Sequence, residues 1–188
     1  AYYTEYDSAE WTGHYIMAES ARYVVHKRDG QEYEAQLALA NLTVALNGLD
    51  KILNVAENGG MARYAWPISE YPGNINDLEE NRYLGTWKGE QYIFEDDTSR
   101  DMHNGVIMGL GFAYLSIENA TIRATIQRLA ERMLDYFIER GWNYLTPDDN
   151  PNGTDLDHDF SLIGTAGIWT LAYLKVGVIV NPEKYGEL

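Results

Sequence analysis

The sequence lacks cysteine altogether and has few basic residues. Without cysteine there is no disulfide bond, no thiolate metal site and no cysteine nucleophile. Its 14 lysines and arginines are outnumbered by 29 acids, which gives a formal net charge of -15. Phosphate groups would repel such a surface, so we expect no nucleic-acid partner and no binding to an anionic membrane.

Long apolar runs are also missing. Charged residues or glycines interrupt every stretch before it reaches the roughly 20 apolar residues that span a bilayer, so no membrane-spanning segment is predicted. The chain begins at Ala1 without a signal-like segment, which we interpret as a mature or excised product. At 188 residues and 45% apolar content it can bury one sizeable core, so a single domain over 1–188 is predicted.

Helical periodicity covers most of the chain. Helices are predicted from Asp7 to Arg28, along the leucine stripe from Ala35 to Leu53, and on either side of the short turn "SIENAT". A fifth follows near 160–178. Residues 58–99 lack this pattern and form a long aromatic loop, in which "TWKGEQYIF" fits a small β-hairpin. The predicted class is all-α, with about five main helices joined as antiparallel hairpins.

Short repeats relate the odd-numbered helices to one another. "GVIMGLGFAYL" from Gly105 and "GTAGIWTLAYL" from Gly164 share an initial glycine and Ala-Tyr-Leu at the same offset. Helices that alternate in direction through successive hairpins would place the first, third and fifth helix starts on the same rim. The repeated glycines destabilise a helix by about 1 kcal/mol each relative to alanine. Close helix packing and room for a ligand are the two explanations.

Acids and histidines gather at these three helix starts. The candidate site residues are His14 in the first cluster, Asp157 in the third and, in the second, Asp97, Arg100, Asp101, His103 and Asn104. Any one acid is explained as a cap or a partner of the helix dipole. An imidazole gains nothing as an N-terminal charge partner, so acids and histidines on one rim indicate acid and base chemistry on a polar substrate.

The aromatic loop between the second and third helices supplies flat side chains near this rim. Aromatic faces stack on sugar rings, and they also form satellite cores under long loops. We expect Trp66 and Trp87 to contact ligand, with Tyr64 beside them.

Together these segments resemble the (α/α) toroids of the six-hairpin glycosidase type and their related polysaccharide lyases. The resemblance rests on "WTGHYIMAESARYVVHKRDGQEYEAQLALANLTVALNGLDKIL" as a first hairpin, "GMARYAWP" as a strand-like step, and "DDTSRDMHNGVIMGLGFAYL" as the next inner helix with its acidic rim. It implies a cleft on the rim of a ring and an oligo- or polysaccharide ligand, and a periplasmic or extracellular location is favoured. The chain supplies fewer than six hairpins, so it is a fragment of a longer toroid, or copies complete the ring, or the resemblance misleads.

Hydrolysis is the first mechanism that such a rim would support. The resemblance implies that Asp97 or Asp101 acts as the general acid. Asp157 would activate water or stabilise the developing cation. His14 is expected to bind substrate.

The second mechanism is elimination from a uronate. Here His103 or Tyr64 would abstract the proton next to the substrate carboxylate, while Arg100 and Asn104 neutralise that carboxylate. A lyase needs a positive pocket for its acidic substrate, and this chain is acidic. The net charge therefore favours the hydrolase.

One segment suggests a metal, although neither mechanism requires a cofactor. "DDNPNGTDLDHD" has the spacing of a calcium loop, with Asp148, Asn150, Asn152 and Asp159 as ligands. Pro151 inside the loop weakens the match, and a solvated loop rich in Asn, Asp and Gly is the alternative.

A non-catalytic function is the remaining alternative. An odd number of helices leaves one helix face unpaired, and that face would favour a partner or a homo-oligomer. The chain would then be a helical-repeat binding domain or a self-assembling structural subunit. The distinguishing observation is whether the rim clusters face a common cavity.

Overall fold

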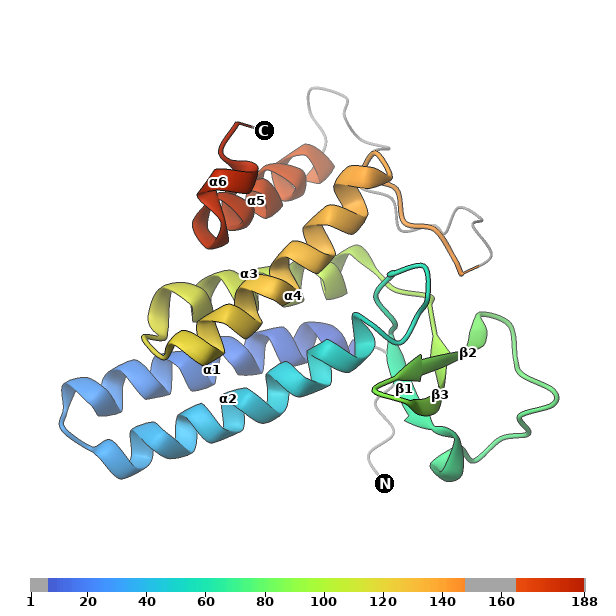
Figure 1. Ribbon diagram of the computed structural model, residues 1–188, viewed down its shortest axis with the longest axis horizontal. Helices are drawn as coiled ribbons and strands as arrows, with labels where there is room; N and C mark the ends of the chain where they lie inside the picture. The colour runs from blue at the N-terminus through green and yellow to red at the C-terminus, as the bar shows by residue number, and fades with distance from the viewer. Residues whose placement is uncertain (1–6, 148–164, 188) are drawn as a thin grey trace.

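The computed structural model describes residues 7–147 and 165–187, and it is mostly helical (Figure 1). In chain order its elements are α1 (Ser8–Arg28), α2 (Glu32–Ile52), β1 (Tyr64–Pro67), a 3-10 turn (Ile68–Glu70), β2 (Arg82–Trp87), β3 (Glu90–Glu95), α3 (Arg100–Ser116), α4 (Ala120–Glu139), α5 (Thr165–Val180) and α6 (Pro182–Tyr185). The predicted helical class is confirmed. So is the β-hairpin, which a third strand joins.

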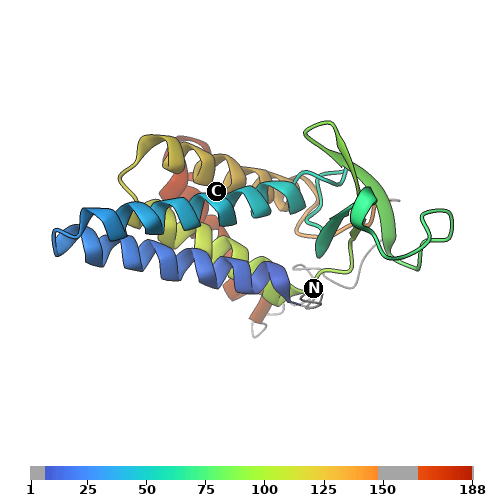
Figure 2. The ribbon, with the colours of Figure 1, turned by 90° about the horizontal axis from the view of Figure 1, so that it is seen from below.

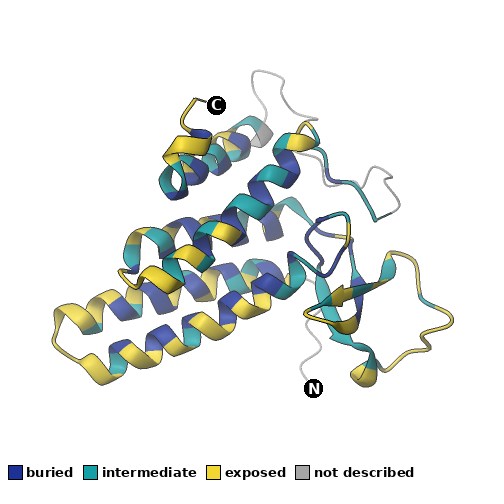
Figure 3. Cartoon of the chain, in the orientation of Figure 1, coloured by how far each residue is buried: buried dark blue, intermediate teal, exposed yellow. Residues whose placement is uncertain are grey.

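The leucine stripe of α2 forms one side of the core. Leu42, Leu46 and Leu49 are buried at helical spacing, and they belong to one cluster with side chains of α1, α3, α4 and α5. Figure 3 shows the buried positions on the facing sides of these helices and the exposed positions outside. Within the described residues, no helix combines the length and apolar content needed to cross a membrane.

Helices α1, α3 and α5 begin at the same end of the molecule. Glu10, in the first turn of α1, lies against Gly105 in the second turn of α3. The guanidinium of Arg100, at the start of α3, is 5.9 Å from the ring centroid of Trp169 near the start of α5. Helices α2 and α4 run back in the opposite direction (Figure 2). Helices α1, α3 and α5 therefore begin on one rim, as predicted, while the closed toroid stays a prediction.

Glycines allow α1 and α3 to touch backbone to backbone. A Cβ atom added to Gly13 would lie 2.0 Å from the carbonyl oxygen of Gly105, and one added to Gly109 would lie 2.5 Å from that of Gly13. On the next face of α3, a Cβ on Gly111 would lie 2.8 Å from a methyl group of Val176 in α5. Close helix packing, rather than room for a ligand, explains these glycines.

The three strands form an antiparallel sheet beside the start of α1, in the order β1-β3-β2 (Figure 1). Lys88 and Gly89 connect β2 to β3 with φ angles of 51° and 82°, as a two-residue hairpin turn requires. One sheet face buries Tyr92 and Phe94 against Val55, in the segment after α2. The alternate residues of the strands, including Tyr64, Arg82 and Glu95, lie on the opposite face.

The glycine contact predicts opposite effects for two alanine substitutions. Gly13→Ala would force α1 and α3 apart and lower the free energy of unfolding by about 3 kcal/mol, the upper range for overpacking. Gly48→Ala, on an exposed position of α2 with no atoms within 4 Å of the added Cβ, should raise it by about 0.5–1 kcal/mol. Urea unfolding of both variants checks this. Similar stability of the two variants would contradict the packing explanation.

Candidate functional site

The first turn of α3 and the segment before it place two candidate general acids in solvent. Ser99 caps the helix, because its side-chain oxygen accepts from the backbone amide of Met102 at 3.3 Å. Asp97 and Asp101 are exposed, and Asn104 is half-buried on the next turn. The cap is thus provided by a serine, and both carboxylates remain accessible.

Arg63 joins this segment to the sheet. Its guanidinium lies 3.8 Å from the carboxylates of both Glu95 and Asp97, and its Nε donates to the backbone oxygen of Asp97. The hydroxyl of Ser8, at the start of α1, donates to the carbonyl of Arg63 at 3.2 Å. One residue therefore connects β1 to the starts of both α1 and α3.

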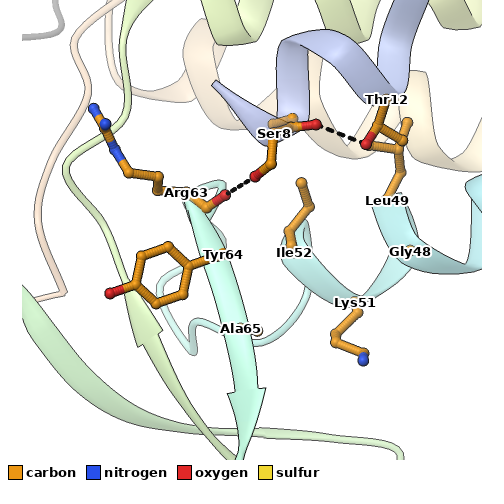
Figure 4. A pocket seen from close by; sticks show the side chains of 10 residues that line it. Ser8, Thr12, Gly48, Leu49, Lys51, Ile52, Arg63, Tyr64 and Ala65 are labelled. Atoms are coloured by element: carbon orange, nitrogen blue, oxygen red, sulfur yellow. Dashed lines mark hydrogen bonds between the residues drawn. The ribbon is translucent and has the colours of Figure 1, made fainter. Parts of the chain in front are cut away.

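A cavity of about 230 Å³ lies at this junction, between α1, the end of α2 and β1. In Figure 4 the side chains of Arg63 and Tyr64 lie on one side of this cavity and the side chain of Lys51 lies on the opposite side. The hydroxyls of Ser8 and Thr12 both donate to backbone carbonyl oxygens. With its hydroxyls used in this way, the cavity is a packing junction between helices and sheet.

His14 and Arg100 contact other groups of the protein on the rim. Nε2 of His14 lies 3.5 Å from the carboxylate of Glu10, and the ring centroid is 5.6 Å from that of Trp11. The Arg100 guanidinium faces Trp169, as described above. Both residues lie on the expected rim, but these contacts do not bring them to the sheet.

His103 lies in the core, which corrects its expected position. The residue is only 1% exposed, and its ring packs edge-on against Phe137 and Tyr144 at centroid distances of 5.1 and 5.3 Å. Nδ1 donates to the carbonyl oxygen of Ser99 at 2.9 Å. Burial lowers the pKa of the imidazole to about 4, because desolvation disfavours the charged form. A polysaccharide does not reach this ring, which argues against His103 as the base of a lyase.

A row of polar side chains crosses the outer face of the sheet. Tyr64, Glu95 and Arg82 occupy paired positions on β1, β3 and β2. The Tyr64 hydroxyl donates to Oε2 of Glu95 at 2.6 Å, and Nε of Arg82 donates to the same oxygen at 3.3 Å. Alternate residues of a strand share a face, so Trp66 lies on the same side as Tyr64.

This outer face carries a pocket of about 170 Å³, called the sheet pocket below. Arg82 is its centre, because Nη1 donates to the hydroxyl of Tyr71 at 3.1 Å and lies 3.1 Å from the carboxylate of Glu79. The pocket is smaller than the roughly 300–1,000 Å³ that encloses a drug-sized ligand, so it fits one ring of a longer one. Its lining consists of Tyr64, Trp66, Tyr71, Pro72, Gly73, Glu79 and Arg82.

Trp66 and Trp87 lie on opposite faces of the sheet. Trp66 is paired with Ile93, whereas Trp87 is paired with Glu90, an odd number of residues away on β3. Lys88 lies over the ring of Trp87 at 4.2 Å, and Lys51 of α2 lies 5.5 Å from its centroid. Trp66 therefore lines the sheet pocket and Trp87 does not, so a ligand contact of Trp87 stays a prediction for the other face.

The sequence interpretation missed Tyr71, Glu79, Arg82 and Glu95 as site residues. Arg82 and Glu95 begin and end the strands of the hairpin, and the antiparallel register pairs them directly. An arginine and a glutamate at matching distances from the turn were the available signal. Tyr71 and Glu79 come from the irregular loop between β1 and β2, and nothing in their spacing indicated a shared pocket.

Several predicted residues lie outside the described part of the chain. They are Asp157, the second acid of the hydrolase, and the calcium ligands Asp148, Asn150, Asn152 and Asp159. Over residues 7–147 and 165–187, no group of three histidine, aspartate or glutamate side chains comes together in a way that could hold a metal ion. The calcium loop stays a prediction.

The buried imidazole predicts a pH dependence of stability. The pKa of His103 falls from 6.5 to about 4 on folding. Between pH 6.5 and pH 4 the imidazole is therefore protonated in the unfolded chain and neutral in the native state. The resulting stability is fully present above pH 6.5 and is lost as the pH falls toward 4, by about 3 kcal/mol. Urea unfolding from pH 7 to pH 4 should show a smaller loss for His103→Gln, and equal losses in the two proteins would contradict a neutral, buried ring.

Comparison with known protein families, curated proteins and solved structures finds no significant match. The function of the chain is therefore argued from its own geometry. Of the predicted site residues, Tyr64 and Trp66 are brought together in one pocket. Asp97 lies outside it and is linked through Arg63 to Glu95, which accepts from Tyr64.

Proposed function

We propose that this chain binds carbohydrate in the sheet pocket and belongs to a protein that hydrolyses glycosidic bonds. The observation that carries the proposal is the pocket itself, in which Trp66, Tyr64 and Tyr71 adjoin Arg82 and Glu79. Aromatic side chains stack on the apolar faces of sugar rings, and the polar groups beside them are suited to the ring hydroxyls. The pocket has room for one sugar unit, and its open surroundings suit the rest of an oligosaccharide.

The carboxylates beside the pocket support hydrolysis as the reaction class. Glu95 and Asp97 each lie 3.8 Å from the guanidinium of Arg63, so their carboxyl groups are within roughly 10 Å of one another, the range of glycosidase acid pairs. Asp97 is exposed and would donate the proton to the leaving group. Tyr64 and Arg82 hold Glu95 in place, which suits a carboxylate that stabilises positive charge on the sugar.

Substitution of Trp66 tests whether carbohydrate binds specifically in the sheet pocket. Trp66→Ala should weaken the binding of a neutral oligosaccharide about tenfold, which corresponds to roughly 1.4 kcal/mol of lost ring contact. Isothermal titration calorimetry against a panel of oligosaccharides measures the affinity. Trp87→Ala is the matched control, because that ring lies on the other face of the sheet under two lysines. Equal effects of the two substitutions would contradict the site.

A second candidate function, a self-associating helical subunit, is favoured by an apolar surface on α3 and α5. Met108, Phe112 and Leu115 recur at helical spacing along α3, and Ile168 and Leu171 lie on the neighbouring α5. All five side chains are exposed, Leu115 to 69%. Exposed apolar side chains on adjoining helices are typical of an interface. We propose a second copy of the chain as the partner for this surface.

Self-association is tested by replacing Leu115, the most exposed of the three side chains on α3. Sedimentation velocity of the unmodified chain should show dimers or larger species that dissociate at low concentration, and Leu115→Glu should give monomers. Val44→Glu serves as the control, since Val44 is equally exposed but lies on α2. A monomeric unmodified chain at high concentration would exclude a homo-oligomer.

A further inference from the structure

The central arginine of the sheet pocket is already surrounded by acceptors. Nη1 of Arg82 donates to the hydroxyl of Tyr71 and lies 3.1 Å from a carboxylate oxygen of Glu79. Its Nε donates to Glu95 at 3.3 Å. Bidentate recognition of a carboxylate uses two parallel N–H groups of the guanidinium fork. Here both Nε and Nη1 are engaged by the protein's own oxygens, so the fork is not presented to a ligand carboxylate.

The charge around the pocket is negative even though two arginines are present. Arg63 and Arg82 lie among the carboxylates of Glu79, Glu95 and Asp97, so acids exceed bases by one. The formal charge of the whole chain, -15, has the same sign. An anionic group brought to Arg82 would lie close to two carboxylates, and like charges at that distance repel one another.

Ligand hydroxyl groups, unlike a ligand carboxylate, can bind to the carboxylates of the sheet pocket. The side chain of Glu79 is 73% exposed, and a carboxylate accepts hydrogen bonds from ligand O–H donors. A sugar hydroxyl can donate as well as accept, so it can donate a hydrogen bond to Glu79. A uronic acid has a carboxylate, which only accepts hydrogen bonds, in place of the hydroxymethyl group of the neutral sugar.

We infer that the sheet pocket takes a neutral sugar and discriminates against uronic acids. This inference rests on the proposed carbohydrate function and specifies its substrate class. It also separates the two enzymatic alternatives, because elimination requires a carboxylate on the substrate whereas hydrolysis does not. A chain that excludes uronates at this pocket is not a uronate lyase.

The test compares oligosaccharides of equal length and linkage that differ only in charge, one built from glucose and one from glucuronic acid. Because the preferred glycosidic linkage is unknown, one such pair of oligosaccharides is titrated by calorimetry at low salt for each of several linkages. In the pair that binds, we expect the neutral member to bind at least about tenfold more tightly. Glu79→Gln removes one charge with little change in shape, and it should narrow this ratio severalfold by strengthening the binding of the glucuronic-acid member.

Glu90→Gln is the control for that variant, because Glu90 lies on the other sheet face, where it accepts from Tyr92 at 2.9 Å. In Glu90→Gln the ratio of the affinities for the neutral and the glucuronic-acid member should equal that of the unmodified chain. Tighter binding of the glucuronic-acid member would overturn the inference while the carbohydrate function stands. Failure of every neutral and acidic member to bind the folded protein, checked by circular dichroism, would overturn both. An equal effect of Glu79→Gln and Glu90→Gln would assign any discrimination to the overall charge and thereby overturn the role of the pocket.

Discussion

The backbone contact between α1 and α3 is the constraint from which the position of the site follows. Gly13, Gly105 and Gly109 bring the two helices together at their starts, closer than any side chain would permit. The segment that enters α3 and the first residue of α1 therefore lie side by side. Arg63 bridges them through Ser8 and Asp97, so β1 is held in place at the rim. A looser helix contact would move the sheet relative to the acids before α3.

The sheet then decides which aromatic and polar groups meet. Because side chains alternate between faces, the register of three short strands puts Tyr64, Glu95 and Arg82 in one row. The same alternation sends Tyr92 and Phe94 to the other face, where they cover the segment after α2. A shift of one residue in this register would exchange the two sets, and it would destroy the pocket and the satellite core together.

Features that depend on local spacing could be predicted from the sequence, whereas features that depend on contacts between distant segments could not. Helix positions follow from local spacing, and the leucine stripe of α2 was predictable because each buried leucine recurs within one or two turns. The common rim also followed, because consecutive hairpins reverse direction. His103 was misplaced because its burial depends on Phe137 and Tyr144, which come from α4 and the segment after it. The shared pocket of Trp66 and Arg82 could not be predicted for the same reason, since it depends on the strand register and on the loop between β1 and β2.

Several basic residues bind other groups of the protein itself, and this affects which ligand charge the protein favours. Arg128 of α4 holds the buried carboxylate of Asp50 at 2.8 Å. Arg132 of α4 and Arg140, just after it, donate to the backbone oxygens of Leu53 and Asn58. In a chain with 14 basic residues and 29 acids, these arginines join one element to another. Because acids outnumber basic residues by 15, the same packing that fixes the helices against one another leaves an excess of negative charge, which favours a neutral ligand.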